Sequence, residues 1–141
     1  MISIFDNMFE HKYDNNIGFF CTNNELNAIY ISSLLKQKKE DILVVANSLY
    51  EANKLYESIV CYTEDAFLFP MDDFLTSEAI AISPELKIKR IDTINNILIN
   101  KPKIIITNLM GALRYLPPKN IWIDNIIKLQ IGVEYNKNNL I

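Results

Sequence analysis

Prolines divide the second half of the chain into short intervals, and their spacing limits what each interval can form. They stand at Pro70, Pro84, Pro102, and at Pro117 and Pro118. Proline lacks a backbone N–H and interrupts both helices and central strands. Each interval is therefore short, and the spacing favours a fold of short alternating segments.

The interval that ends at Pro102 predicts one amphipathic helix. Ser83 is a suitable N-cap, and Pro84 suits the first helical position. The apolar residues expected on the buried face are Ile88, Ile91, Ile94 and Leu98, while Lys87, Lys89 and Asp92 are expected to face away.

Short apolar runs alternate with helical patterns along most of the chain. Residues 104–107 are a continuous β-branched run, which is typical of a strand covered on both faces. Asn108 is expected to cap a short segment over 109–116, which ends before Pro117. Similar runs occupy residues 17–21, 42–46 and 66–69. Helical patterns follow the first two, over residues 22–37 and 49–61, and the pair Thr22 and Glu25 suggests a capping box. The alternation predicts a three-layer α/β fold with a mostly parallel sheet and helices on both faces.

Both ends of the chain differ from this central pattern. Residues 2–13 predict a short helix, and residues 121–123 a short strand or turn. Residues 126–134 alternate with a period of two, which predicts a strand covered on one face. We therefore expect three parts: an N-terminal helical segment over 1–15, an α/β domain over 16–125, and the start of another domain over 126–141. Because the sequence stops on Leu140 and Ile141, we expect it to be part of a larger protein.

Composition narrows the classes of function. The chain has 14 basic and 17 acidic residues, a formal charge of −3, so it does not attract nucleic acid as a whole. Few ligands are present for a Cys/His metal site, since the chain has one histidine, His11, and two cysteines, Cys21 and Cys61. We expect both thiols to be reduced and buried. The N-terminus lacks a basic leader before an apolar core, which favours a cytoplasmic protein without membrane contact.

Several polar groups allow two interpretations. Asp72 and Asp73 follow a predicted strand end, where carboxylates bind metals or cap a turn, and we favour capping of the next turn. Arg90 and Arg114 either contact neighbouring domains or form internal ion pairs, for which the candidate partners are Asp73, Glu78 and Asp92.

Two further clusters have a structural explanation that we prefer. The basic residues Lys36, Lys38 and Lys39 fall at a predicted helix C-terminus, where cations complement the dipole, and we favour this over a phosphate-binding patch. Aromatic residues could form a stacking platform for single-stranded nucleic acid, but we prefer core packing because few cations accompany them. These residues are Phe67, Phe69, Phe74, Tyr115 and Trp122.

Three blocks resemble the UvrB-like N-terminal region of the bacterial transcription-repair coupling factors. They are ILVVANSLYEANKLYESI, FPMDDFLTSEAIAISPELKIKR and KIIITNLMGALRYLPP, and with their order and spacing the resemblance spans roughly residues 17–141. It implies a UvrB-like first domain with the fold of a nucleotide-binding protein. It also implies that residues 128–141 open an inserted second domain that carries the surface for UvrA.

The phosphate loop that this fold would carry is degenerate. A loop of the pattern GxxxxGK[ST] aligns without gaps on residues 21–28. Cys21 then replaces the first glycine, Leu26 the second, Asn27 the lysine and Ala28 the hydroxyl residue. Leu26 obstructs close approach of the backbone to phosphate, Asn27 lacks the charge, and Ala28 lacks the magnesium ligand. We expect no nucleotide, metal or catalysis in this chain.

The resemblance implies a function for the intact protein. It would be an ATP-dependent DNA translocase that displaces stalled RNA polymerase and recruits the excision-repair machinery through UvrA. ATP and magnesium would act in a downstream motor, and this chain would be a scaffold that packs against the rest of the same polypeptide. The alternatives are a nucleotide-binding domain or a DNA-contacting domain of a UvrB-like helicase.

Overall fold

The computed structural model describes residues 23–73, 83–127 and 130–134. The predicted helix over 2–13 and strand over 17–21 lie outside these residues, as do Cys21, His11 and Glu78. The described elements are α2 (Asn24–Lys38), β1 (Ile42–Ala46), α3 (Leu49–Val60), β2 (Ala66–Phe69), α4 (Pro84–Ile97), β3 (Ile104–Asn108), α5 (Leu109–Ala112) and α6 (Lys119–Asp124).

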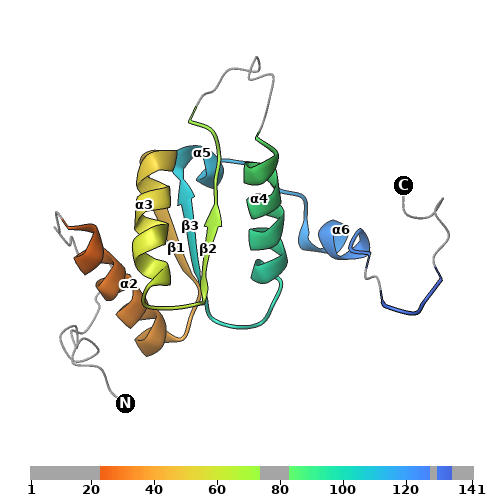
Figure 1. Ribbon diagram of the computed structural model, residues 1–141, viewed down its shortest axis with the longest axis horizontal. Coiled ribbons are helices and arrows are strands. Elements are labelled where there is room, and N and C mark those ends of the chain that lie inside the picture. Colours follow the sequence, from red (N-terminus) through yellow and green to blue (C-terminus); the bar gives the residue numbers. More distant parts are fainter. Residues whose placement is uncertain (1–22, 74–82, 128–129, 135–141) are drawn as a thin grey trace.

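The three described strands form one parallel sheet in the order β1-β3-β2 (Figure 1). β3 is the central strand, and its Ile104 aligns with Ile42 on one side and with Ala66 on the other. Ile104 and Ile106 are fully buried, as expected for a strand with neighbours on both edges and helices on both faces. The predicted three-layer α/β architecture is confirmed.

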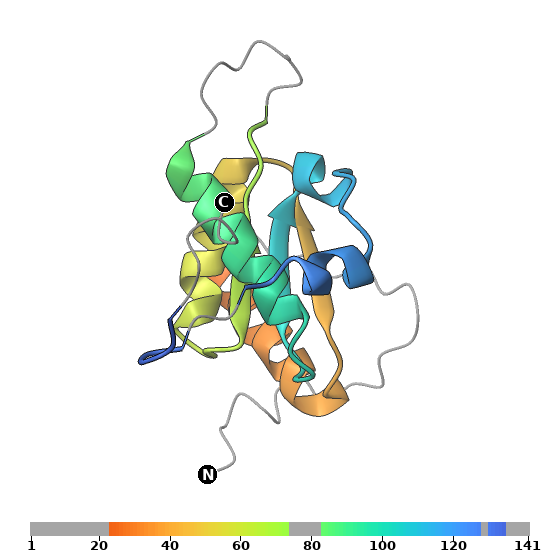
Figure 2. The same cartoon turned by 90° about the vertical axis from the view of Figure 1, so that its right-hand side faces the viewer.

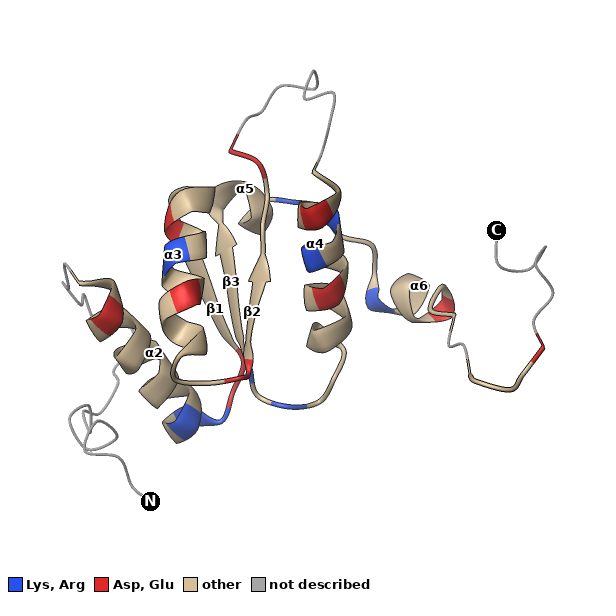
Figure 3. Cartoon of the chain, viewed as in Figure 1, with Lys and Arg blue, Asp and Glu red and all other residues tan. Residues whose placement is uncertain are grey.

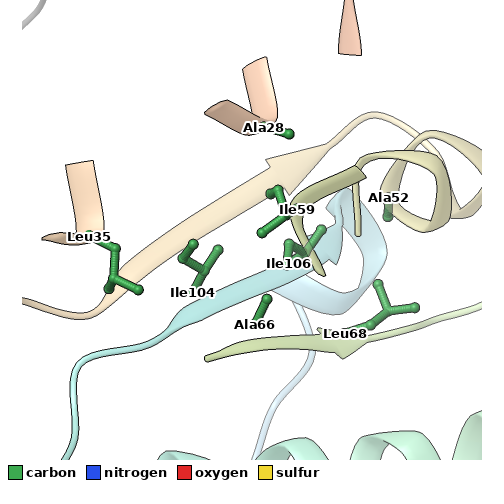
Figure 4. Close-up of a cluster of buried hydrophobic side chains, with 8 residues drawn as sticks. All are labelled: Ala28, Leu35, Ala52, Ile59, Ala66, Leu68, Ile104 and Ile106. Carbon is green, nitrogen blue, oxygen red and sulfur yellow. The ribbon is translucent and has the colours of Figure 1, made fainter. Parts of the chain in front are cut away.

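Helices cover the sheet unequally (Figures 1 and 2). α3 lies on one face and contacts all three strands, and α2 packs against α3. α4 lies on the other face, over β2. Buried apolar side chains concentrate between α2, α3 and the sheet (Figure 4): Ala28, Leu35, Ala52, Ile59, Ala66, Leu68, Ile104 and Ile106.

The first described helix begins one residue later than a capping box at Thr22 and Glu25 requires. Asn23 is the N-cap, and its Oδ1 accepts a hydrogen bond from the Glu25 N–H at 2.8 Å. A capping-box pattern occurs instead at α3, where Ser48 Oγ accepts from the Glu51 N–H at 3.2 Å and Glu51 Oε2 accepts from the Asn47 N–H at 3.3 Å. The pattern Ser-x-x-Glu at 48–51 was present in the sequence and identifies this cap.

The prediction of which residues of α4 are buried is wrong at the centre of the helix. Ile88 and Ile91 are exposed, whereas Thr93 is only 2% exposed. Thr93 Oγ1 lies 2.6 Å from the Leu68 carbonyl of β2, which is a hydrogen bond that fixes the rotation of the helix. A polar contact with the strand has therefore overridden the apolar periodicity. Residues expected to face solvent do so: Lys87, Lys89 and Asp92.

The C-terminal part of the chain also differs from expectation. Residues 119–124 form the helix α6 rather than a strand or turn, and its Trp122 Nε1 donates to Asn95 Oδ1 of α4 at 3.2 Å. Residues 131–132 form a turn, with Gly132 at a φ of 87°, and none of the residues 130–134 belongs to a strand, contrary to the prediction. α5 ends at Ala112, so the segment expected to run from 109 to 116 is shorter than predicted.

Candidate functional site at the carboxyl end of the sheet

Polar groups meet where the three parallel strands end. β1 leads through Ser48 into α3, β2 leads to Asp73, and β3 ends at Asn108. In parallel α/β sheets this edge is the usual place for ligands, because strand ends and helix N-termini converge there. This edge is therefore the candidate functional site of the described part of the chain.

Asp73 is bound to the start of α3. Both of its carboxylate oxygens lie 2.9 Å from the Leu49 N–H, and Oδ1 also accepts from Asn108 Nδ2 at 2.6 Å. The prediction that Asp73 acts as a capping residue is right in kind. The helix that it caps begins 24 residues earlier in the chain, and the turn that follows Asp73, which was the predicted one, lies outside the described residues. Among the described residues, no cluster of three or more His, Cys, Asp or Glu is placed to hold a metal ion.

Asn108 joins all three strand ends and is fully buried. Its Nδ2 donates to the Met71 carbonyl at 2.7 Å as well as to Asp73, and its Oδ1 accepts from the Gly111 N–H at 3.2 Å. The prediction that Asn108 caps the next helix is confirmed, but its link to the loop after β2 could not be read from local sequence. A side chain at position 111 would clash with Thr107 Oγ1, so glycine is required there.

The two arginines occupy different settings. Arg90 Nη1 donates to the Pro70 carbonyl at 3.2 Å and contacts Met71 Sδ, so it binds backbone rather than a carboxylate. Within the described residues it forms no ion pair with Asp73 or Asp92. Arg114 follows α5 and is exposed. Contacts of either residue with another domain stay a prediction.

The residues aligned with a phosphate loop lie at the start of α2. Leu26 is 42% exposed, Asn27 is half-buried, and Ala28 is fully buried against the core. These three residues belong to a regular helix, and no glycine occurs between Asn23 and Lys38. Cys21 lies outside the described residues.

Acidic and basic positions are interspersed along α3 and α4 in the described part of the chain (Figure 3). Lys36 and Lys38 lie in the last turn of α2, where they were expected to complement the helix dipole. On α3, the hydrogen bond and charge interaction with Tyr50 raise the pKa of the exposed Lys54 ammonium, whose Nζ lies 4.7 Å from the ring centroid.

Burial of the aromatic residues and cysteines agrees only in part with expectation. Phe69 is buried in β2, as predicted for core packing, but Tyr115 is 86% exposed and belongs to no core. Cys61 is a free thiol and is exposed rather than buried, at the C-terminal end of α3. Phe74 lies outside the described residues.

Sequence comparison finds relatives with one shared name. The chain is 32% identical over 106 residues to the transcription-repair-coupling factor of Staphylococcus haemolyticus, covering 74% of this chain and 9% of that protein. It is 26% identical over 115 residues to the factor of Bacillus subtilis, covering 80% of this chain and 10% of the relative. It is also 28% identical over 104 residues to the factor of Staphylococcus aureus strain USA300, covering 72% and 9%. The chain thus spans about a tenth of these relatives.

No family model and no solved structure matches the chain. In the part of the chain that the structure describes, no helix has both the length and the apolar character needed to cross a membrane.

Proposed function

We propose that this chain, which belongs by sequence to the transcription-repair-coupling factors, is a non-catalytic scaffold region of such a factor. The intact polypeptide would be an ATP-dependent DNA translocase that displaces stalled RNA polymerase and recruits the excision-repair complex through UvrA. This region would present the UvrA-binding domain and pack against the rest of the polypeptide. ATP and magnesium would act downstream of it.

The observation that carries the proposal is the occupied N-terminus of α3. A phosphate at the carboxyl edge of a sheet is bound by free N–H groups in the first helical turn. Here the Leu49 N–H donates to Asp73 and the Glu51 N–H donates to Ser48. A carboxylate and a hydroxyl of the chain itself therefore accept from two of the donors that an anionic ligand would use.

The start of α2 supports the same conclusion. Asn23 accepts from the Glu25 N–H, and an acidic side chain at Glu25 opposes a second anion there. Leu26, Asn27 and Ala28 supply neither a cation nor a metal ligand. The contacts at the starts of α2 and α3 thus support the proposal that neither helix binds a phosphate.

Calorimetry of the 141-residue chain with ATP and magnesium tests the non-catalytic part of the proposal. We expect no heat of binding at micromolar to millimolar nucleotide, and saturable binding would contradict it. A salt-sensitive affinity for duplex DNA, measured in parallel, would instead favour a DNA-contacting domain.

The scaffold role is tested in a full-length relative. In the Bacillus subtilis factor, the matched 115-residue region is replaced by this chain or deleted. We expect the replacement to retain ATP turnover and capture of UvrA, and the deletion to retain ATP turnover but lose capture of UvrA. Loss of ATP hydrolysis in the well-folded deletion variant would place catalytic groups in this region and refute the proposal.

A further inference from the structure

Two side chains of α4 hold the end of β2 through its backbone carbonyls. Thr93 Oγ1 donates to the Leu68 carbonyl at 2.6 Å. One helical turn earlier, Arg90 Nη1 donates to the Pro70 carbonyl at 3.2 Å. Side chains three residues apart lie on the same face of a helix, so both bonds connect one face of α4 to the chain where β2 ends.

Arg90 also contacts a thioether at this place. Its Nη1 lies 3.3 Å from Met71 Sδ, and both side chains are half-buried. A thioether is a weak acceptor, so this contact contributes little to stability. Within the described residues, Arg90 donates through Nη1 alone, and its Nε and Nη2 groups have no acceptor there. A stronger acceptor on the sulfur of Met71 would therefore find unused N–H donors within reach.

Oxidation of the thioether creates such an acceptor. When hydrogen peroxide is the oxidant, a sulfur lone pair attacks one peroxide oxygen, the S–O bond forms and the O–O bond breaks. The leaving oxygen takes up the remaining proton as water, so the thioether loses two electrons and the peroxide gains them. The sulfoxide oxygen is a strong acceptor, and its hydrogen bond to a guanidinium is charge-assisted.

We propose that Met71 is an oxidative modification site and that Arg90 binds its sulfoxide. The modified residue lies at the junction of two elements, because the Met71 carbonyl also accepts from Asn108 Nδ2 at the end of β3, at 2.7 Å. Oxidation by a peroxide therefore strengthens the connection between α4 and the sheet. Methionine oxidation usually disrupts packing, so the sign of this effect is specific to the contact with Arg90. The proposal does not depend on the scaffold role.

Thermal unfolding of the oxidised chain tests the proposal. In a Met8→Leu, Met110→Leu background, Met71 is the sole methionine apart from Met1. The folded protein is treated with hydrogen peroxide and then with a thiol reductant, which reverses reversible oxidation of the cysteines and leaves the sulfoxide. Peptide mass spectrometry should find one added oxygen at Met71, and the Tm should rise by about 2–5 °C.

Three substitutions in the same background assign this shift. In Arg90→Leu, the sulfoxide has no guanidinium donor, so oxidation should lower the Tm by about 2–5 °C instead of raising it. Lys89→Leu removes one positive charge from the adjacent exposed position of α4, and it should keep the rise. Met71→Leu should show no change of Tm after the treatment.

Two results would overturn the proposal. One is the same change of Tm on oxidation with and without Arg90. The other is a Met71 that stays unoxidised in the folded chain under conditions that oxidise the half-buried Met110 of the unsubstituted protein.

A further variant keeps the test decisive if Arg90→Leu does not fold. Met71→Gln places a carbonyl oxygen near the position of the sulfoxide oxygen without any oxidation. With Arg90 present, its Tm should exceed that of Met71→Leu by about 2–5 °C. An equal or lower Tm would contradict binding of a polar acceptor by Arg90.

Discussion

The carboxylate of Asp73 caps the helix that begins at Leu49, with both oxygens 2.9 Å from the Leu49 N–H. The same carboxylate accepts from the buried Asn108, so one side chain joins the segments that follow all three strands. Charge near a helix N-terminus is favourable, and hydrogen bonds to charged groups are stronger than neutral ones. The carboxyl edge of the sheet is consequently closed by its own residues.

Removal of this carboxylate should destabilise the chain. We expect Asp73→Ala to lower the free energy of unfolding by about 1–2 kcal/mol, because the Leu49 N–H and the Asn108 amide lose their acceptor. Urea denaturation measures the difference. The neighbouring Asp72→Ala is the control and should change stability by less than about 0.5 kcal/mol. An equal effect of the two substitutions would contradict a specific capping role for Asp73.

Position 111 should not tolerate a methyl group. In Gly111→Ala the new Cβ would clash with Thr107 Oγ1, which is held by its hydrogen bond to the Phe69 carbonyl at 2.7 Å. We expect a loss of about 1–3 kcal/mol, typical of overpacking in a rigid site. Thermal unfolding compares this variant with Ala112→Ser at the adjacent exposed position. An unchanged Tm would contradict this prediction, because it would mean that α5 can move away from β3 at little cost in free energy.

Two buried hydroxyls should respond in opposite directions. Ser32 Oγ is buried and has no hydrogen-bond partner among the described residues, whereas Thr93 Oγ1 donates to the Leu68 carbonyl. We expect Ser32→Ala to raise the free energy of unfolding by about 1 kcal/mol, and Thr93→Val to lower it by about 1–2 kcal/mol. Denaturation of both variants in the same buffer provides the comparison. If the free energy of unfolding changes in the same direction in both, the different roles given to the two hydroxyls are wrong.

The ion pairs Lys103–Asp41 and Lys101–Asp65 should differ in their contribution to stability. Lys103 is almost fully buried; its Nζ lies 3.5 Å from Asp41 and 2.7 Å from the Ile99 carbonyl, and its N–H also donates to Asp41. The Lys101–Asp65 pair is shorter, at 2.6 Å, but its lysine is 63% exposed. We expect Asp41→Asn to cost about 1–3 kcal/mol because it weakens the compensation of a buried charge. Asp65→Asn should cost less than about 1 kcal/mol because water screens that pair. Calorimetric unfolding of both variants measures the two losses of stability. A larger loss in Asp65→Asn than in Asp41→Asn would contradict this expectation.

Local sequence was sufficient for the elements themselves. Three apolar runs predicted the strands at 42–46, 66–69 and 104–107, the last of which extends to Asn108, and cap residues marked helix starts at Ser83 and Asn108. These signals depend on neighbours within a few residues, such as side-chain periodicity, capping hydrogen bonds and the missing N–H of proline. The alternation of strands and helices then implied a parallel sheet, which the structure has.

Contacts between distant residues could not be read in that way. The periodicity of α4 favoured Ile88 and Ile91 as buried, but a hydrogen bond from Thr93 to β2 turns other residues inward. Asp73 reaches a helix 24 residues earlier, and residues 119–124 form α6, with Trp122 bonded to α4. Spacing along the chain fixes which face a residue shares with its neighbours, whereas partners such as a buried carbonyl or a free N–H are supplied only when the strands come together.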